Sequence, residues 1–587
     1  MNFSQPHHEA HMTIVVEKNI AIPMRDGAVL RGDLYRPAGD GAFPTLIQRT
    51  PYNKQLLALT GLTLDPIRAA AHGYAVLIQD VRARWASEGD VFFMYRNEFD
   101  DGTDTVQWAT TQNWCNGKIG AYGLSYMGAM TWLMAAGAPD SIRAIAPTTA
   151  PFDFWNNHLW RGGALNLGLL LSWTLATIGP SARVRNTSPV EIPAALSALI
   201  DAIDSFDAWS RHAPMNALPP ALPDDTSFVP FFFEILKQHT PNAFTRAMLM
   251  NDRHGAVRAP ALITAGWHDV LLESDLAHFA AMKRCGATTE ARDKTRLVIG
   301  PWAHGMFQHV VGDVDFGFRA NGMFLDMRED LTALHLRWFD RWLADNENGI
   351  DQEARVKIFV QGANRWRDES DWPLARAADT PLFLARDGGL SGDRPKHTAA
   401  RSYRYDPADP CPTAGGPILM PLTYPRGPVD QRTWLQRSDV LAFTSEPIEA
   451  DLEVTGYVRA ILFAATTGKD TDWIVKLCDV HPSGTTISVC DGVLRARFRK
   501  GFDAATLIEP GEVNEYEIAL SATSMVFKRG HRLRVLVTSS DFPRYDRNPN
   551  TGEWPSEAVS FEPAQQQIFC GGDRSSCIIL PIVKAAG

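Results

Sequence analysis

Strand-like and helix-like patterns alternate along the first 151 residues of the chain. Short apolar runs at residues 75–78, 119–122 and 144–146 are typical of buried parallel strands, and the segment around Thr103 to Ala109 predicts a helix. Alternation of this kind is typical of a doubly wound sheet with helices on its faces. The N-terminal part is therefore predicted to be an α/β domain.

The pattern changes at about residue 152. From there to about residue 255 no strand pattern is found, and apolar stretches at 165–171 and 194–203 favour helices. Strand signals return from residue 256, and a further helix is predicted to end near Asn348-Gly349. Its buried stripe is formed by Leu331, Leu334, Trp338, Phe339, Trp342 and Leu343. The segment 152–255 is therefore predicted to be a helical cap inserted into the α/β domain.

Beyond about residue 375 the hydrophobic pattern has a period of two. Residues 452–458 and 532–537 alternate apolar and polar side chains, with turn residues between such runs. This predicts a β-sandwich, which in isolation would also suit carbohydrate binding. The predicted parts are thus 1–151 with 256–374, the cap 152–255, and the sandwich 375–587.

The composition favours a soluble enzyme. The 587 residues include 57 basic and 67 acidic side chains, a net charge of -10 that argues against nucleic acid as a partner. No apolar run is long enough for a membrane span, and the first 20 residues lack the apolar core of a signal peptide, so a cytoplasmic location is expected. The seven scattered cysteines predict reduced thiols. His7, His8 and His11 could chelate a metal, but a solvated terminus is the simpler interpretation.

A candidate nucleophile follows the strand-like run 119–122. Residues 123–128 read Gly-Leu-Ser-Tyr-Met-Gly and are followed by a helix-like run. In α/β-hydrolases a sharp strand-to-helix turn holds the nucleophilic serine clear of the sheet, and small residues flank it because bulky ones would clash. The second glycine lies one residue further on than in the common G-x-S-x-G motif. Ser125 is the predicted nucleophile.

The acid and the base are expected after the serine, in that order along the chain. Asp269 follows the apolar run 260–266, and His304 follows the run 296–300. Because ligands bind beyond the carboxyl ends of parallel strands, both residues are expected on the same rim as Ser125. Taken separately, Asp269 could start a helix and His304 could be a loop histidine bonded to backbone.

Two neighbouring residues compete for these roles. His268 precedes the predicted acid, and a side chain adjacent to Asp269 in sequence is expected to point elsewhere. Asp275 is predicted to lie on the solvated face of the following helix.

With these residues the chain resembles the cocaine esterase and X-prolyl dipeptidyl-peptidase family of serine hydrolases, also called CocE/NonD hydrolases. The resemblance extends over nearly the whole chain and is strongest to the bacterial cocaine esterase type. The resemblance is based on the motifs PMRDG (23–27), DLYRP (33–37), RTPYNK (49–54), QDVR (79–82), SEG (87–89), the GLSYMG turn, GWHD (266–269), GPWAH (300–304) and DFPRYDRN (541–548).

The resemblance implies an α/β-hydrolase core with carboxylesterase activity and a C-terminal jelly roll that packs on it. It implies Ser125 as nucleophile, His304 as general base and Asp269 as the residue that orients the base. It also implies an oxyanion hole formed by the hydroxyl of Tyr52 and the backbone N–H of Tyr126, since attack on an acyl carbon creates an alkoxide that needs donors. From the residues alone, Tyr52 would be a core tyrosine after a strand.

The substrate pocket is less well defined by the sequence. Its candidate residues are Trp173, Trp160, Leu271, Leu419 and Met420. Aromatic residues of a cap are as often core as pocket, but Trp173 matches a pocket tryptophan of the cocaine esterase type. Leu271 replaces a phenylalanine of relatives that hydrolyse bulky aromatic esters. Leu271-Leu272 also stand where amino-acid ester hydrolases carry carboxylates, which predicts neutral substrates, with Asp153 and Glu273 as open alternatives.

We therefore expect a serine carboxylesterase that hydrolyses neutral esters through an acyl-enzyme, without a metal or organic cofactor. Its expected partner is a small-molecule ester, with neither nucleic acid nor a membrane, and a homodimer is an open alternative to a monomer. An amidase, a peptidase or an acyltransferase could use the same residues. A scaffold protein that has lost activity is disfavoured because all four residues of the machinery are present.

Overall fold

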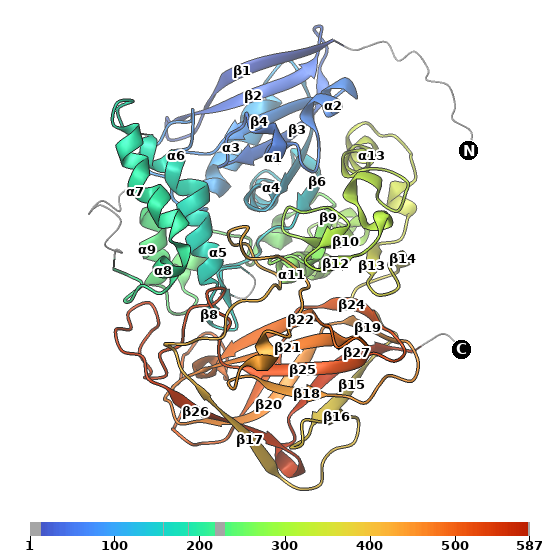
Figure 1. Ribbon diagram of the computed structural model, residues 1–587. Helices are drawn as coiled ribbons and strands as arrows, with labels where there is room; N and C mark the ends of the chain where they lie inside the picture. The colour runs from blue at the N-terminus through green and yellow to red at the C-terminus, as the bar shows by residue number, and fades with distance from the viewer. Residues whose placement is uncertain (1–12, 156–157, 186, 218–228, 585–587) are drawn as a thin grey trace.

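A computed structural model describes residues 13–155, 158–185, 187–217 and 229–584. Figure 1 shows a mixed α/β part, a group of helices beside it, and an all-β part beneath both. The first two parts come from residues up to about 370, and the all-β part follows them along the chain. This arrangement agrees with the predicted α/β fold followed by an all-β domain.

A ten-stranded mixed sheet forms the centre of the α/β part. In sheet order its strands are β1 (Ile14–Pro23), β2 (Val29–Pro37), β4 (Ala75–Asp80), β3 (Phe43–Thr50), β5 (Cys115–Leu124), β6 (Ile142–Thr148), β9 (Leu262–His268), β10 (Arg296–Ala303), β13 (Val356–Val360) and β14 (Arg365–Glu369). The seven strands from β4 to β13 run parallel, and antiparallel pairs close both edges. Every residue of β4 and of β10 is buried, as expected for strands covered on both faces.

Helices cover this sheet on both faces. They are α1 (Leu57–Thr60), α2 (Pro66–Ala71), α3 (Glu98–Thr110), α4 (Tyr126–Gly137), α11 (Leu272–Cys285), α12 (Thr289–Lys294) and α13 (Leu331–Leu343). The predicted helix with the stripe 331–343 is α13, which ends at Leu343 and not near Asn348-Gly349, and in which Trp342 is only partly buried. Its Trp338 Nε1 donates to the carbonyl of Ile145 in β6 at 3.0 Å. The predicted helix around 103–109 is α3, whose first turn carries the carboxylates Glu98, Asp100 and Asp101.

One prediction about α11 was wrong. Asp275 lies in this helix, as expected, but its side chain is fully buried and not solvated. Its Oδ1 accepts a hydrogen bond from the backbone N–H of Ala150 at 2.9 Å, in the loop after β6. The face of α11 that carries Asp275 therefore packs against the sheet rather than facing solvent.

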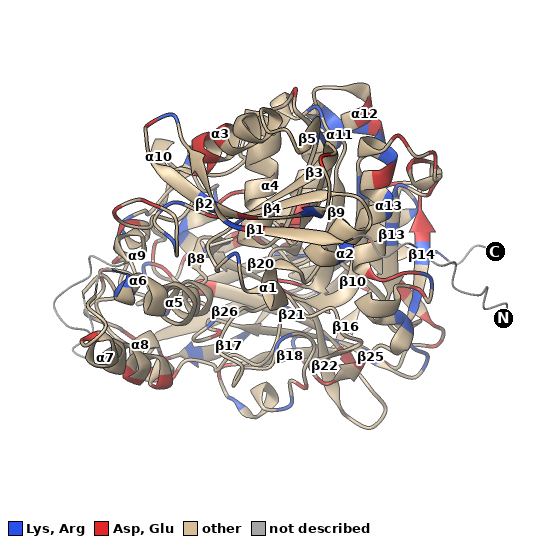
Figure 2. Cartoon of the chain, turned by 90° about the horizontal axis from the view of Figure 1, so that it is seen from above, with Lys and Arg blue, Asp and Glu red and all other residues tan. Residues whose placement is uncertain are grey.

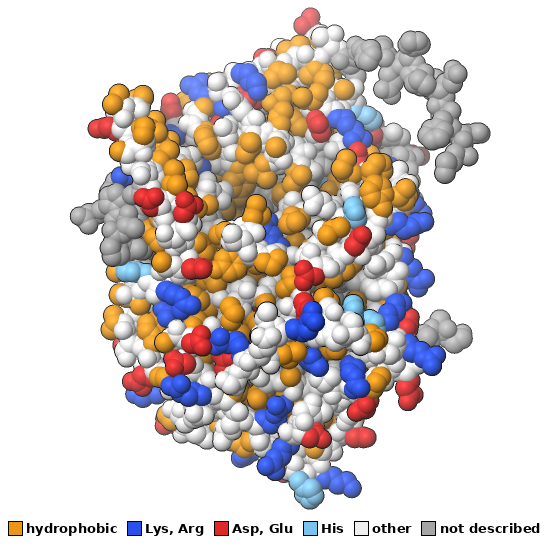
Figure 3. Space-filling model, in the orientation of Figure 1, with side chains coloured by type: hydrophobic (Ala, Val, Ile, Leu, Met, Phe, Trp, Pro, Cys, Tyr) orange, Lys and Arg blue, Asp and Glu red, His pale blue; other side chains and the backbone are white. Residues whose placement is uncertain are grey.

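The cap is mainly helical. It holds α5 (Leu167–Ser172), a π-helix (Trp173–Ile178), α6 (Gly179–Val184), α7 (Ile192–Asp204), α8 (Phe206–Ser210), α9 (Pro230–Leu236), α10 (Ala243–Arg246) and a 3₁₀ helix (Arg253–Ala256). The prediction missed a small antiparallel hairpin of β7 (Trp160–Arg161) and β8 (Ala164–Leu165), whose strands are too short to leave a periodic pattern. Figure 3 shows a hollow in the molecular surface between the cap and the α/β part, and hydrophobic side chains gather in it.

The C-terminal part contains two antiparallel sheets. One holds β16 (Leu390–Ser391), β15 (Ala377–Leu384), β27 (Cys577–Val583), β20 (Arg459–Thr466), β26 (Ala564–Cys570), β17 (Ala399–Tyr405), β19 (Leu452–Gly456), β23 (Asn514–Ala519) and β24 (Thr523–Phe527). The other holds β18 (Leu441–Thr444), β25 (Arg532–Thr538), β21 (Asp472–Val480) and β22 (Thr486–Arg495). The alternating runs predicted at 452–458 and 532–537 are β19 and β25.

Hydrogen bonds connect the cap hairpin to the all-β part. Arg161 Nη2 donates to the carbonyl of Asp491 at 2.8 Å, and the N–H of Leu165 donates to Asp546 at 2.9 Å. Asp546 in turn pairs with Arg495 at 2.7 Å, and Arg544 pairs with Asp491 at 2.7 Å. The segment DFPRYDRN thus contacts the cap hairpin through Asp546, whose buried charge is paired with Arg495.

Charges of both signs are intermingled at the periphery. Figure 2 shows Lys and Arg next to Asp and Glu on outer helices such as α12 and α13. None of the helices in the described ranges combines the length and the apolar character that a bilayer crossing requires. All seven cysteines are free thiols, as the sequence predicted.

Candidate active site

The turn between β5 and α4 holds Ser125 in a strained backbone conformation. Its φ of 61° and ψ of -123° are unusual for a residue with a side chain. A Cβ on Gly123 would lie 2.6 Å from the backbone of Met127, and one on Gly128 would lie 2.9 Å from Ala150 Cβ. The second glycine is needed at 128 because that face of α4 rests on the loop after β6, which explains the longer spacing of the motif.

The structure brings Ser125, His304 and Asp269 together. His304 Nε2 lies 2.9 Å from Ser125 Oγ, and His304 Nδ1 lies 3.0 Å from each carboxylate oxygen of Asp269. The three residues follow the carboxyl ends of β5, β10 and β9, so the sheet fixes their separation. Asp269 is 2% exposed and His304 is 6% exposed, so the pair is shielded from water.

Further hydrogen bonds orient the pair. Asp269 Oδ1 also accepts from the backbone N–H of Leu271 at 2.8 Å, at the start of α11. The carbonyl of His304 accepts from Arg426 Nη1 at 3.0 Å, a contact supplied by the all-β part. The competitor His268 points away, with its Nε2 2.7 Å from Gln361 Oε1.

The hydroxyl of Tyr52 faces the same site. Trp173 Nε1 donates to the Tyr52 hydroxyl at 3.2 Å, and Tyr52 also interacts with Ser125. Burial raises the pKa of Tyr52 to about 12 in spite of these hydrogen bonds, so the hydroxyl keeps its proton at neutral pH. It can therefore donate to an oxygen near Ser125.

The motif residues around Tyr52 anchor its loop. Lys54 Nζ pairs with Asp80 at 2.9 Å, and Arg49 pairs with Glu98 at 2.7 Å, all with buried side chains. These contacts join the RTPYNK segment to QDVR and to α3. The loop that carries Tyr52 is thereby anchored beside Ser125.

Tyr126 begins α4. The first N–H groups of a helix have no acceptor within the helix, so the N–H of Tyr126 is available beside Ser125. Its side chain is fixed elsewhere, with the hydroxyl donating to Glu98 at 2.8 Å and the ring stacked on Tyr95 at 4.3 Å. The backbone of Tyr126 is thus the part that faces the reaction site.

A cavity opens at Ser125. Among the residues that line it are the predicted residues Tyr52, Tyr126, Trp173, Leu271, His304 and Leu419. It is also lined by residues that the sequence did not indicate, namely Met94, Tyr95, His158, Leu169 and Val270. The described lining contains no Asp or Glu.

Two predicted pocket residues lie elsewhere. Trp160 stacks on Trp155 at 4.4 Å and lines a separate cleft against the all-β part. Met420 is buried against α5, where a Cβ on Gly168 would lie 2.6 Å from its sulfur. Leu419 and Met420 are adjacent in sequence, yet Leu419 lines the cavity and Met420 is buried in the core.

The two carboxylates left open by the sequence do not line the cavity. Glu273 is partly buried, and its Oε1 accepts from the N–H of Ala522 at 2.7 Å. Asp153 accepts from the N–H of Trp155 at 2.8 Å.

His158 is the unexpected polar residue of the cavity. Its ring stacks on Phe154 at 5.8 Å and is 7% exposed. Burial lowers its pKa to about 3, with a smaller effect from the nearby His304, so the imidazole is neutral at pH 7. Its Nδ1 has no hydrogen-bond partner within the described protein. No periodicity marks a histidine in an irregular loop, so only packing could identify it.

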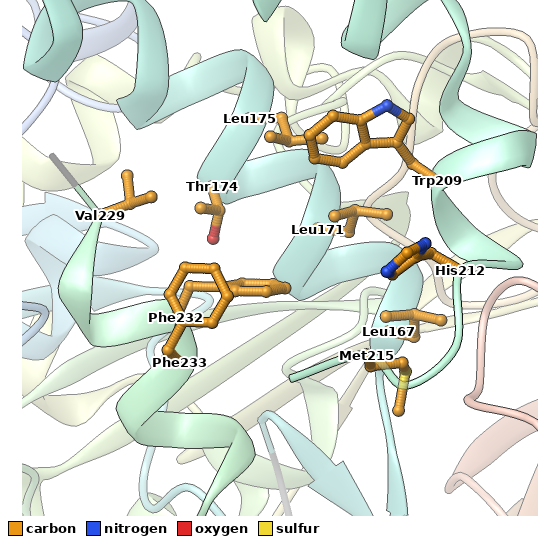
Figure 4. Close-up of a pocket in the computed structure, with 10 residues that line it drawn as sticks. All are labelled: Leu167, Leu171, Thr174, Leu175, Trp209, His212, Met215, Val229, Phe232 and Phe233. Carbon is orange, nitrogen blue, oxygen red and sulfur yellow. The ribbon is translucent and has the colours of Figure 1, made fainter. Parts of the chain in front are cut away.

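A second, apolar cavity lies inside the cap. Figure 4 shows its lining residues, Leu167, Leu171, Thr174, Leu175, Trp209, His212, Met215, Val229, Phe232 and Phe233. It shares none of these residues with the cavity at Ser125, since Leu169 and Trp173 face that cavity instead. The second cavity is therefore separate from the candidate reaction site.

Two family models match the chain. The model described as X-Pro dipeptidyl-peptidase (S15 family) matches residues 26–306, and the model described as X-Pro dipeptidyl-peptidase C-terminal non-catalytic domain matches residues 348–579. The chain is also 36% identical to the cocaine esterase of Rhodococcus sp. (strain MB1 Bresler) over 583 residues, covering 97% of this chain and 99% of the relative.

Solved structures share the whole fold. An α-amino acid ester hydrolase superposes with a TM-score of 0.78 at 24% identity, covering 99% of this chain and 98% of its own. A CocE/NonD family hydrolase from Staphylococcus aureus gives a TM-score of 0.69 at 19% identity, covering 97% and 94%. At these identities the structures establish the fold alone.

Proposed function

The chain belongs to the cocaine esterase and X-Pro dipeptidyl-peptidase family and is a serine hydrolase that acts on esters, and from this premise we propose that it hydrolyses neutral carboxylic esters through an acyl-enzyme on Ser125. The observation that carries the proposal is the chain of contacts from Ser125 through His304 to Asp269, at 2.9 and 3.0 Å. Such an arrangement allows the serine to lose its proton as it attacks.

In the first half of the reaction Ser125 Oγ attacks the acyl carbon while His304 Nε2 takes its proton. Asp269 stabilises the imidazolium that forms, and the alkoxide accepts hydrogen bonds from the Tyr52 hydroxyl and the Tyr126 N–H. Collapse of this intermediate breaks the bond to the alcohol oxygen, which leaves with the proton from His304. A water molecule then attacks the acyl-enzyme in the same way, with His304 as the base. Collapse of the second intermediate releases the carboxylic acid and returns the proton to Ser125.

The lining of the cavity supports a neutral substrate. An ammonium group next to Leu271, Val270 and Leu419 would lose its hydration without gaining a counter-ion, because no carboxylate is among the described lining residues. A neutral acyl group of the same size avoids this cost. Neutral His158 adds one polar atom without adding charge.

A peptidase is the second candidate, since the matching family models are named for X-Pro dipeptidyl-peptidases. Release of an X-Pro dipeptide from the N-terminus of a peptide would place an ammonium group in this cavity, and the described lining has no carboxylate to pair with it. We therefore favour the ester. An acyltransferase would use the same residues and is distinguished by its acceptor.

We also propose that the two C-terminal sheets form a jelly roll that closes one side of the cavity. Leu419 in the cavity lining and the contact from Arg426 to His304 support this role. The division into a core (1–151 and 256–374), a cap (152–255) and this domain (375–587) belongs to the same proposal. The cytoplasmic location and the homodimer stay predictions.

The test is a panel of p-nitrophenyl esters with increasing acyl size, assayed beside dipeptide p-nitroanilides. We expect ester hydrolysis to exceed anilide hydrolysis, and Ser125→Ala to lower it by several orders of magnitude while folding normally. A fluorophosphonate probe should label Ser125, as located by mass spectrometry. An adduct on another serine, or faster cleavage of the anilides, would refute the proposal.

A further inference from the structure

A group of one aspartate and two histidines lies in the all-β part, at the end of the β21–β25 ladder. These strands are antiparallel, with Asp479 opposite Leu533 and Val480 opposite Arg532. Continuing this register by one step places His481 opposite His531. Side chains two apart on a strand share a face, so Asp479, His481 and His531 meet on one face of the sheet.

The distances between these side chains match those between ligands of one metal ion. His531 Nδ1 lies 2.9 and 3.0 Å from the two oxygens of Asp479, and His481 Nε2 lies 3.4 Å from Asp479 Oδ2. Two ligands about 2.0–2.1 Å from zinc lie about 3.4 Å apart at a tetrahedral angle and about 2.9 Å apart at a right angle. One ligand atom from each residue lies within 4.8 Å of the others.

The surroundings leave room for additional ligands. The three side chains line a cavity of about 220 Å³ at the boundary with the β13–β14 hairpin, which contributes Gln361 and Asn364. A cavity of this size holds several water molecules, which could complete a coordination shell. Asp479 is 4% exposed and His481 is 41% exposed, so a cation can enter from the His481 side.

Positive side chains nearby are already paired or point away. Lys528 lines the cavity, but its Nζ pairs with Asp451 at 2.9 Å. Arg532 and Arg534 alternate with Leu533 and lie on the opposite face of β25. Two imidazoles and one carboxylate therefore face the cavity.

We propose that Asp479, His481 and His531 bind a divalent transition-metal ion, with Zn²⁺ as the ion best suited to two imidazoles and one carboxylate. The metal joins the turn after β21 to the turn before β25. None of its ligands lines the cavity at Ser125, so the site is structural and separate from the ester reaction.

The experiment is a calorimetric titration of chelator-treated, full-length protein with ZnCl₂. His7, His8 and His11 lie outside the described residues and could bind zinc themselves, so the titration uses the background His7→Gln/His8→Gln/His11→Gln. We expect one zinc ion per chain, a zinc-dependent rise in melting temperature, and no response to CaCl₂, because imidazole favours zinc over calcium.

The key variant is His481→Gln in the same background. Because His481 is well exposed, its loss leaves the fold intact, which the melting temperature without metal verifies. We expect at least a 10-fold loss of zinc affinity, and a similar loss for His531→Gln. The matched control is His72→Gln, since His72 also pairs with a carboxylate, Asp340 at 2.9 Å, in a different part of the fold.

Each possible result of these titrations either supports or overturns the proposal. No zinc binding in the background protein, or affinity unchanged by His481→Gln and His531→Gln, would overturn the proposal. Loss of binding in these two variants with retention in His72→Gln would support it. Esterase activity should be the same in all of these variants, which distinguishes this test from that of the proposed function.

Discussion

Replacing Tyr52 by phenylalanine removes one oxygen atom from the site and leaves the ring in place. The hydroxyl lies between Trp173 Nε1, which donates to it at 3.2 Å, and Ser125. Because its pKa is about 12, the hydroxyl is protonated at neutral pH and is free to donate to a developing oxyanion. The substitution therefore removes a donor from the transition state and an acceptor from the folded protein.

These two losses have different sizes and are measured separately. Loss of one oxyanion donor costs about 100- to 1000-fold in kcat, or about 2.7–4 kcal/mol of transition-state stabilisation. In the folded protein, Trp173 Nε1 loses its partner, which costs about 1–3 kcal/mol of unfolding free energy unless water replaces the hydroxyl. Folded domains are typically stable by about 5–15 kcal/mol, so a loss of this size is expected to leave the protein folded and not to account for a loss of kcat.

The assay measures kcat and KM on one neutral p-nitrophenyl ester and the unfolding free energy in urea. Two controls separate the effects. Trp173→Phe removes the hydrogen bond to Tyr52 but keeps the oxyanion donor, and Tyr95→Phe removes a hydroxyl from the same cavity. We expect both controls to retain kcat within about 10-fold, which is below the effect of losing an oxyanion donor. A kcat for Tyr52→Phe within threefold of the unmodified protein would refute the donor role and make Tyr52 a packing residue.

Three further predictions test the pocket, the turn that holds Ser125 and the buried histidines. Phenylacetic acid methyl ester should have a specificity constant at least about 10-fold above that of phenylglycine methyl ester, or about 1.4 kcal/mol, and equal values would indicate an undetected carboxylate in the pocket. Gly128→Ala should cost about 1–3 kcal/mol of unfolding free energy, because the new Cβ would lie 2.9 Å from Ala150 Cβ, whereas Gly255→Ala, whose nearest neighbour is 3.8 Å away, should be tolerated. Burial lowers the pKa of His268 and His335 to about 4, so their contribution to stability is present above pH 6.5 and is lost as the pH falls from 6.5 towards 4. Urea unfolding at pH 7.5 and pH 5 should show lower stability at pH 5, and equal values would contradict this reasoning.

The sequence alone determined the order of the main elements and the candidate reacting residues. A glycine-flanked serine between a strand and a helix, and polar residues directly after two later apolar strands, were sufficient to select Ser125, Asp269 and His304. These residues could be selected from the sequence because parallel strands place their carboxyl ends on one edge of the sheet. Residues that directly follow such strands therefore meet there, regardless of their separation in sequence. The proposed oxyanion donor Tyr52 was instead indicated by the family resemblance, since a tyrosine after a strand is equally suited to a core.

Only the tertiary structure decided which side chains line the cavity. Met420 turns into the core while Leu419 faces Ser125, and His158 enters the cavity from an irregular loop. Asp275 is buried because α11 packs on the loop after β6. The histidines of the proposed metal site, His481 and His531, are 50 residues apart and meet through the register of two strands. The direction of each of these side chains depends on packing between distant segments, which local sequence patterns do not encode.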